Sequence, residues 1–277
     1  MKWYIPAKTF LIGEYVAITG GPAIVLTTPT YFTLAMVKPI GLHGIHIDSP
    51  AAKWWRQQPP IDIGLNWHDP YNNIGGMGAS SAQFVGVYHA YTEFTQQAYT
   101  HQQMLHAYIN VAYDGVGLAP SGYDLLAQAY NLTQTKTEIT NKYIYINQHT
   151  QQLCEVPWNF ADIRFITLHT GKKLATHQHL KTLNNIHNLS TLTEITNMAK
   201  TAFDTTNSLH LIQAINAYYQ QLQQQNLVAE HTAQYIQQLK LKCNPLAIKG
   251  CGAMGADVIL LIVATEEYDN TMKKLEL

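Results

Sequence analysis

The stretch Gly75-Gly76-Met77-Gly78-Ala79-Ser80-Ser81-Ala82 stands directly before an apolar pattern that is typical of a helix. Phe84, Val85, Tyr88 and Tyr91 follow it at the spacing of one helix face. Glycine lets backbone N–H groups converge because it has no Cβ. A helix N-terminus adds unpaired N–H donors and a partial positive charge. Together they form a ready site for phosphate, so this stretch predicts binding of a nucleotide or a phosphorylated ligand.

The overall composition limits the kinds of partner. The chain has 277 residues, which suits one large domain or two small ones, and 47% of them are hydrophobic. The net charge of −1 is not that of a nucleic-acid-binding protein, so no nucleic acid is expected as a partner. Arg56 and Arg164 are the only arginines. A site that holds several phosphates would therefore depend on lysines, backbone amides or a metal ion.

The cysteines and the apolar runs indicate a cytoplasmic protein. Cys154, Cys243 and Cys251 form no CxxC pair and have no histidine at zinc spacing, which argues against a structural metal site. A sparse, odd set of cysteines fits a reducing compartment. The first residues, MKWYIPAKTF, carry no leader pattern, and no run reaches the roughly 18 apolar residues of a spanning helix. We expect no membrane partner.

Strands and helices are predicted in both halves of the chain. Residues 3–39 are rich in β-branched and aromatic residues, a further strand is expected near 46–49, and 53–75 look irregular. The remaining expected elements are helices at 80–99, 102–113, 124–130, 176–184, 191–203, 208–225 and 229–241, and strands at 142–148, 163–170 and 257–264. This mixture favours an α+β or α/β protein with two lobes that divide near 150–162.

A second glycine-rich stretch, Lys249-Gly250-Cys251-Gly252-Ala253-Met254-Gly255-Ala256-Asp257, contains a formal GxGxxG pattern. A dinucleotide-binding unit needs a strand before such a loop and a helix after it. Here a strand follows, and the chain has no room for a further βαβ unit. We therefore reject the dinucleotide interpretation. A tight turn without function is the alternative for this stretch alone.

Two shorter segments carry single charged residues of interest. Asp124 follows Ser121-Gly122 at the start of an apolar helix, where an acid often serves only as a cap or first-turn residue. Lys8 lies in the first strand, and lysine is rarely buried without a partner. Its alternative role is that of an edge-strand lysine that reaches solvent.

Taken together and in order, these four segments resemble the GHMP kinases, the superfamily of galactokinase, homoserine kinase, mevalonate kinase and phosphomevalonate kinase. The first family motif, Pro-x-Lys-x-x-Leu-x-Gly-Glu-His/Tyr, is similar to residues 6–15, and the Gly-Leu-Gly-Ser-Ser-Ala-Ala loop to residues 76–82. The Ser-Gly-x-Asp element resembles residues 121–124, and the Gly-Ala-Gly-Gly-Gly loop resembles residues 252–256. A weaker similarity covers Thr170-Gly171 and Thr176. The matches run from residue 6 to residue 257.

The resemblance implies a two-lobed α+β fold. The N-terminal lobe, residues 1–155, would be of the ribosomal S5 domain 2-like type and would bind ATP. The C-terminal lobe, residues 156–277, would be ferredoxin-like, and ATP would lie at the junction. A small-molecule acceptor is the other implied partner, and a homodimer is left open.

The resemblance also implies roles for individual residues. Asp124 would be the catalytic base and Lys8 the cation that favours its charged form. The residues implied in ATP binding are Gly75, Gly76, Gly78, Ala79, Ser80, Ser81, Gly252, Ala253 and Gly255. Either Ser80 or Ser81 would bind Mg²⁺, since two alignments of the loop are open, and Asp114 is a weaker metal candidate. The implied acceptor contacts are Glu14, Tyr15, Ser121 and, more weakly, Thr176.

Two features bear on the substrate. Mevalonate kinases carry a glutamate before the Ser-Gly-x-Asp loop, and here only Asp114 is near, offset by one position. The Pro120-Ser121-Gly122 form is common among mevalonate kinases, whereas Tyr15 after Glu14 looks more like phosphomevalonate kinases. We expect mevalonate as the acceptor, because it needs no second phosphate pocket, with phosphomevalonate as the alternative. Diphosphomevalonate decarboxylase and a non-catalytic binding protein of the same fold are further alternatives.

Overall fold

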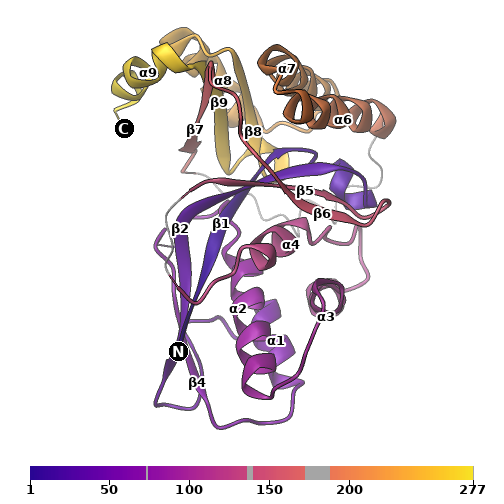
Figure 1. Ribbon diagram of the computed structural model, residues 1–277, viewed down its shortest axis with the longest axis vertical. Helices are drawn as coiled ribbons and strands as arrows, with labels where there is room; N and C mark the ends of the chain where they lie inside the picture. The colour runs from indigo at the N-terminus through magenta and orange to yellow at the C-terminus, as the bar shows by residue number, and fades with distance from the viewer. Residues whose placement is uncertain (73, 136–139, 172–187, 277) are drawn as a thin grey trace.

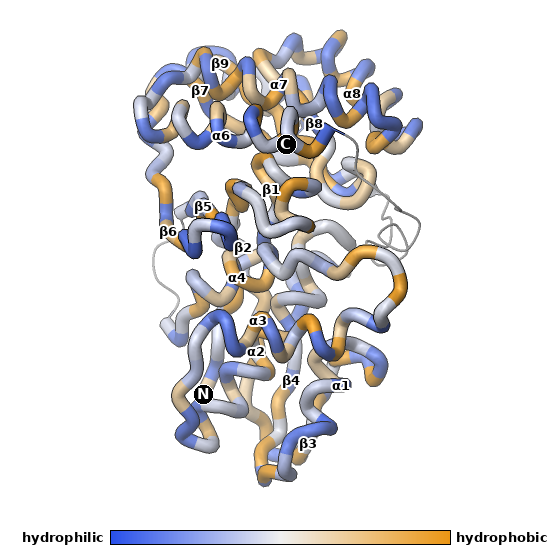
Figure 2. The backbone as a smooth tube through the Cα atoms, turned by 90° about the vertical axis from the view of Figure 1, so that its right-hand side faces the viewer, coloured by the Kyte–Doolittle hydropathy of each residue, from blue (hydrophilic) through white to orange (hydrophobic). Residues whose placement is uncertain are grey.

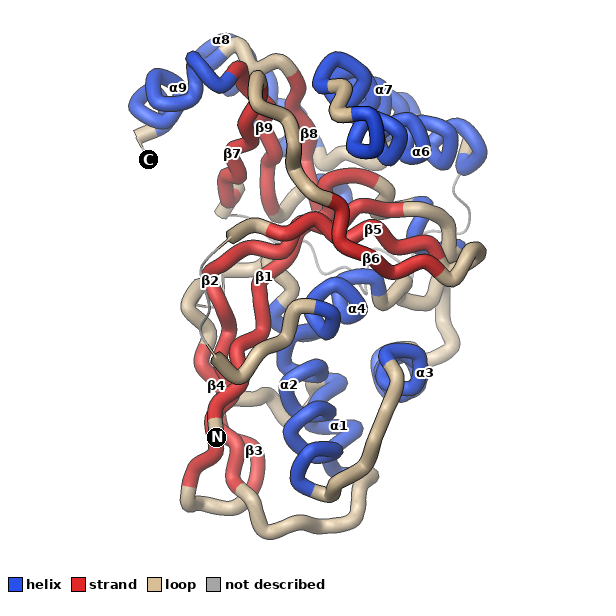
Figure 3. The backbone as a smooth tube through the Cα atoms, in the orientation of Figure 1, coloured by secondary structure: helices blue, strands red, loops and turns tan. Residues whose placement is uncertain are grey.

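The structure is a computed structural model that describes residues 1–72, 74–135, 140–171 and 188–276 (Figure 1). It contains two β-sheets, one formed in the first part of the chain and one in the second. Helices pack on both sheets, as Figure 3 shows. None of the described helices has the length and apolar character needed to cross a membrane. The mixed α+β class that the sequence predicts is confirmed.

The first sheet is built around one long strand. Its strands are β1 (Lys2–Ile12), β2 (Ala23–Val37), β3 (Gly41–His43), β4 (Gly64–His68), β5 (Lys142–Asn147) and β6 (Gln152–Val156). β2 pairs antiparallel with β1 along its length, with β5 through its first half and with β4 through its second half. β3 adds parallel to β4, and β6 adds antiparallel to β5. β1 is almost wholly buried, in keeping with its mainly apolar residues.

Four helices pack together beside this sheet. They are α1 (Pro50–Arg56), α2 (Ala79–Phe94), α3 (His101–Ala112) and α4 (Tyr123–Tyr130). α2 and α4 contact both β1 and β2, whereas α3 packs outside them against α1, α2 and α4. The N-termini of α2 and α4 thereby come to the same strand, β1. The candidate functional site lies at this place.

The second sheet is antiparallel with the strand order β7-β9-β8. Its strands are β7 (Ile163–His169), β8 (Ala247–Cys251) and β9 (Val258–Ala264). Its helices are α6 (Leu189–Thr205), α7 (Ser208–Gln224), α8 (Glu230–Cys243) and α9 (Tyr268–Leu275). Hydrophobic and hydrophilic residues alternate along α6 and α7 (Figure 2), as expected for helices with one buried face. Short 3-10 turns complete the fold: η1 (Val16–Thr19), η2 (Ala253–Gly255) and η3 (Thr265–Glu267).

The two sheets share one hydrophobic core. The face of the second sheet that carries Ile166, Ile259 and Leu261 packs against α8 and α9 in a separate cluster. Its opposite face, with Val258 and Leu260, belongs to the same buried cluster as β1. A division of the chain at residues 155 and 156, and the named lobe types, therefore stay predictions.

Several expected elements differ from the structure. The strand expected at 46–49 is wrong: these residues form a turn that ends at Ser49, whose hydroxyl accepts the Ala52 N–H and caps α1. The region 53–75, expected to be irregular, contains the end of α1 and β4. α2 ends at Phe94, well before residue 99. The helix expected at 176–184 lies outside the described residues.

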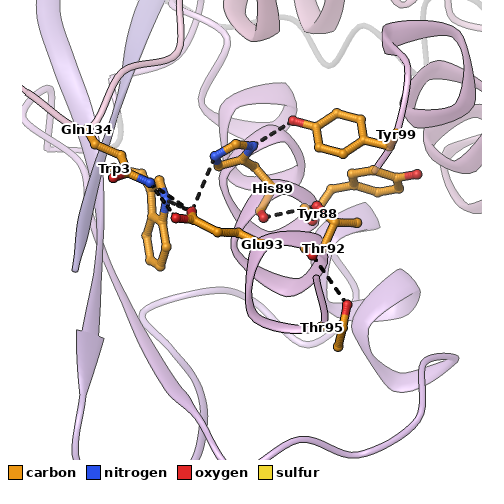
Figure 4. Close-up of polar contacts among 8 residues, drawn as sticks. All are labelled: Trp3, Tyr88, His89, Thr92, Glu93, Thr95, Tyr99 and Gln134. Atoms are coloured by element: carbon orange, nitrogen blue, oxygen red, sulfur yellow. Dashed lines mark hydrogen bonds and ion pairs between the residues drawn. The ribbon is translucent and has the colours of Figure 1, made fainter. Parts of the chain in front are cut away.

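A polar network anchors the far end of α2 to β1 (Figure 4). Glu93 accepts hydrogen bonds from the Trp3 indole N–H at 2.8 Å and from the Gln134 amide at 2.7 and 2.8 Å. His89 lies 3.5 Å from Glu93 through Nε2, and its Nδ1 lies 2.6 Å from the Tyr99 hydroxyl. These contacts hold the C-terminal part of α2 against β1, the strand that carries Lys8.

Candidate functional site

The first glycine loop, residues 75–78, lies against β1. The Lys8 backbone N–H donates to the Met77 carbonyl at 3.0 Å. The side-chain amide of Gln128, on α4, donates to the Pro6 carbonyl at 2.9 Å and to the Gly78 carbonyl at 3.1 Å. Gln128 is fully buried and so ties strand, loop and helix together. The loop is held from both sides.

Gly78 sets the direction in which α2 begins. It has a left-handed φ of +79°, and a Cβ there would lie 2.7 Å from Lys8 Cε. A side chain at this position would therefore collide with the lysine as well as strain the backbone. In the described structure no side chain caps this helix N-terminus. Its first N–H groups point into a site suited to an anion.

The two serines of this turn are in different environments. Ser81 is 1% exposed, and its hydroxyl donates to the Gly78 carbonyl at 3.0 Å. Ser80 is exposed at the start of the helix. The Ser81 hydroxyl stabilises the turn, whereas the Ser80 hydroxyl faces solvent and is free to meet a ligand.

Lys8 and Asp124 lie together at the side of this turn. The Lys8 ammonium is 3.9 Å from the nearer Asp124 carboxylate oxygen, with side chains 11% and 28% exposed. Asp124 is in the first turn of α4, directly after Gly122 with its φ of +69°. Burial, and secondly the Asp124 charge, raise the pKa of Tyr108, which is fully buried close by. The contact between Lys8 and Asp124 that the sequence predicts is present, and Asp124 keeps access to solvent.

The second glycine loop, residues 252–256, meets the first one at Asp257. Gly76 and Gly252 both have left-handed φ values, and a Cβ at either position would run into the Asp257 side chain. The Thr170 N–H and hydroxyl donate to the Asp257 carbonyl at 3.2 and 3.3 Å, which brings the end of β7 to the same point. Gly252, Ala253 and Gly255 therefore lie next to the first loop, although the sequence separates them widely.

A groove of about 890 Å³ opens beside the first loop. It is lined by Met77 of the first loop, by Tyr71 and by His169 at the end of β7, with Trp158 and Phe165 farther along. The Tyr71 and His169 rings lie 5.8 Å apart. Its size is within the range of small-molecule sites, and it combines aromatic walls with polar groups.

The residues predicted to bind the acceptor do not all line one place. Tyr15 is 3% exposed, and the Glu14 carboxylate lies 2.8 Å from the Lys249 ammonium in the interior. Ser121 accepts the Tyr123 N–H at 3.3 Å and lines a separate cleft of about 420 Å³ beside η1. Thr176 lies outside the described residues. A role for these four residues in acceptor binding stays a prediction.

The metal candidates do not form an all-protein site. Asp114 is exposed in the loop after α3, where its carboxylate accepts the Val116 N–H at 3.2 Å. Among the described residues there is no group of three or more His, Cys, Asp or Glu side chains that could hold a metal ion. A cation here would depend on a serine hydroxyl, on phosphate oxygens and on water, as is common for Mg²⁺.

Two buried residues of the site are missing from the sequence prediction. Lys249 is fully buried on β8, where burial acts to lower its pKa but Cys251 and Glu14 raise it above the ordinary value. Gln128 is equally buried. A charged residue inside the apolar run before Gly250 is a visible signal for the lysine. Gln128 gives no comparable signal, because glutamine is common on helix surfaces.

Comparisons with known proteins agree on the architecture. No family model and no curated protein sequence matches the chain. Among solved structures, it superposes on Methanococcus jannaschii mevalonate kinase with a TM-score of 0.71 and 14% identity, over 100% of this chain and 94% of the other. Streptococcus pneumoniae phosphomevalonate kinase, in complex with phosphomevalonate and AMPPNP, gives 0.74 and 15% over 99% and 94%. Lactococcus lactis galactokinase, complexed with galactose, gives 0.75 and 14% over 99% and 88%.

The chain has the GHMP kinase fold. The similarity extends over nearly the whole length of both chains in each comparison. The three solved structures are of kinases named for different acceptors, and each is only 14–15% identical to this chain. The fold thus agrees with the resemblance seen in the motifs, while the acceptor must be argued from the site.

Proposed function

We propose that this protein is an ATP-dependent small-molecule kinase that phosphorylates a hydroxyl group, with mevalonate as the acceptor. The observation that supports it best is the Lys8–Asp124 pair at 3.9 Å, set beside the uncapped N-terminus of α2. Phosphoryl transfer to a hydroxyl requires a base for the hydroxyl proton and a site that holds the phosphates.

Each part of the site has a defined task in this proposal. Asp124 accepts the proton of the acceptor hydroxyl, whose oxygen forms the new bond to the γ-phosphorus as the bond to ADP breaks. Lys8 lies beside the Asp124 carboxylate and adds positive charge where the transferred group passes. The first N–H groups of α2 and the two glycine loops hold the phosphates, because backbone amides can approach closely where no Cβ intervenes.

The residues present fit a nucleotide with a partly hydrated Mg²⁺. The left-handed Gly78 and the exposed Ser80 leave the start of α2 open, and the groove beside Met77 has room for a nucleoside. Mg²⁺ would be held by the Ser80 hydroxyl in preference to Ser81, with Asp114 as a weaker candidate, and would neutralise charge on the phosphates. Position and charge, and not covalent chemistry, make up most of the catalysis.

Among the described residues, the contacts of the two arginines favour mevalonate over phosphomevalonate. Of the two arginines, Arg56 donates to the Ile47 carbonyl on an exposed surface, and Arg164 lies over the Tyr268 ring at 3.4 Å. Neither is aimed at the Lys8–Asp124 pair by these contacts. Phosphomevalonate remains the second candidate because Tyr15 follows Glu14. We further propose a cytoplasmic location, in keeping with three free cysteines. With mevalonate as acceptor, the protein would act in the mevalonate pathway.

An assay of ADP release separates these possibilities. Purified protein is supplied with ATP, Mg²⁺ and one acceptor at a time: mevalonate, phosphomevalonate, diphosphomevalonate, homoserine or galactose. Turnover with mevalonate supports the proposal, and turnover with phosphomevalonate alone supports the second candidate. Release of carbon dioxide from diphosphomevalonate identifies a decarboxylase. Nucleotide binding without turnover indicates a binding protein, and the absence of both turnover and nucleotide binding overturns the kinase proposal.

A further inference from the structure

A buried ion pair links the end of β1 to the second sheet. The Lys249 ammonium lies 2.8 Å from a Glu14 carboxylate oxygen, and the two side chains are 0% and 7% exposed. The same ammonium donates to the Cys251 thiol at 3.4 Å. A buried ion pair is weak evidence for stability, because an apolar pair of similar volume often serves as well. What a charge pair adds is one preferred distance and direction between the elements that carry it.

The next residue makes a second contact with the same part of the chain. The Tyr15 hydroxyl accepts the Met254 N–H at 3.2 Å and lies 3.5 Å from the Leu227 carbonyl. Met254 has a left-handed φ of +54°, which a side chain disfavours. Consecutive residues thus hold the second glycine loop twice: Glu14 through Lys249 just before the loop, and Tyr15 at Met254 within it.

The strand that carries these contacts also carries Lys8. β1 runs from Lys2 to Ile12, pairs with β2 along its length with register irregularities at Pro6/Ala7 and Phe10/Ile12, and leads directly into Gly13 and Glu14. A paired, buried strand transmits position with little give. The location of Lys8, beside Asp124 and the first glycine loop, is therefore coupled mechanically to the location of the second loop.

We infer that the Glu14–Lys249 ion pair is a positioning element, which fixes the second glycine loop against the Lys8–Asp124 centre so that both loops meet the same phosphate chain. The inference rests on the proposed function. It assigns the position of the second glycine loop to Glu14 and Lys249, two interior residues that act through the loop. It predicts a loss in turnover that is separate from any loss in nucleotide affinity, because misplacement of about 1 Å can cost about 100-fold in rate.

The decisive variant removes both charges. In Glu14→Gln/Lys249→Met neither charge is left buried alone, so the fold is retained, whereas each single variant leaves one unpaired charge and is expected to be unstable. The matched control is Glu155→Gln/Lys142→Met, which removes an exposed ion pair of 3.1 Å between β5 and β6. Urea unfolding is measured first, and we expect the two double variants to have comparable midpoints.

Two measurements then test the inference. We expect the buried double variant to lower kcat by at least about tenfold, with AMPPNP affinity nearly unchanged, and the control to keep both. Without any substrate, backbone hydrogen exchange over residues 252–257 should become faster in the buried variant only. Unchanged kcat, or unchanged exchange in the loop, overturns the inference. Where the unaltered protein turns over no acceptor, the proposed function fails and the exchange measurement alone decides the role of the pair.

Discussion

The Lys8 ammonium lies 3.9 Å from the Asp124 carboxylate, and the two residues come from different layers of the fold. Lys8 belongs to β1 of the first sheet, and Asp124 to the first turn of α4, which packs on that sheet. Gly78 lies against the lysine, where a Cβ would come within 2.7 Å of Lys8 Cε. Strand, glycine loop and helix thus meet at a single contact, from which the first two predictions follow.

Replacement of Asp124 by asparagine should remove the base and keep the shape. We expect kcat to fall by about 100-fold or more, because a positioned base contributes about 10²–10⁴-fold. Nucleotide affinity, measured by AMPPNP titration, should hardly change. The control is Asp62→Asn, at an exposed carboxylate, which should keep full activity. Strongly weakened nucleotide binding in Asp124→Asn would instead assign Asp124 a structural role.

Gly78→Ala should disturb the site more than the same substitution at a glycine of similar backbone conformation elsewhere in the chain. Gly115 has a φ of +84° and open space around it, so Gly115→Ala shares the backbone cost, roughly 1–2 kcal/mol, without any collision. In Gly78→Ala the added methyl group displaces the Lys8 side chain. We expect both variants to lose this backbone contribution to the unfolding free energy, and Gly78→Ala to lose more because of the collision. A large loss of kcat is expected only in Gly78→Ala. Equal activity in the two variants would contradict this geometry.

The two serines at the start of α2 should separate a ligand contact from a structural one. Ser80→Ala is expected to raise the Mg²⁺ concentration needed for half-maximal turnover, because the exposed hydroxyl is the available one. Ser81→Ala should mainly lower the unfolding free energy, by about 1 kcal/mol for the lost hydrogen bond. Each variant is the control of the other, and the opposite pattern would reverse the assignment.

Stability should fall in mild acid through His89. Burial lowers the pKa of His89, and Glu93 opposes this only in part. The unfolded chain therefore binds a proton that the folded chain resists, so this stability is complete above about pH 6.5 and is lost as the pH falls through the folded-state value. Tyr99, whose pKa is raised to about 12 by burial, keeps its proton throughout.

Urea midpoints at pH 7.5 and 5.5 measure this effect. We expect His89→Gln to show a smaller decrease between the two pH values than the unaltered protein. His101 and His169 also have pKa values lowered by burial, and they titrate in both proteins, so the difference isolates His89. The same decrease in both proteins would show that burial of His89 does not lower its pKa in the folded chain.

Much of the fold was accessible from local patterns, and the missing parts have a common cause. α3, α7 and α8 lie close to their predicted ranges because each has an apolar face at helical spacing. β6 and β8 were not expected, since five-residue strands gain their stability from a partner strand that is distant in sequence. The predicted strand at 46–49 is wrong because a short segment needs a partner strand, and no strand pairs with these residues in the described structure.

The sequence by itself determined which residues are candidates for the chemistry, because glycine loops, a lysine in a strand and an acid at a helix start have few roles in common. The tertiary structure alone decided how they meet. It showed that Ser81 is buried and Ser80 exposed, and that Glu14 faces Lys249 in the interior. Such pairings depend on the packing of distant elements around β1, and no local pattern of residues encodes a distance across a core.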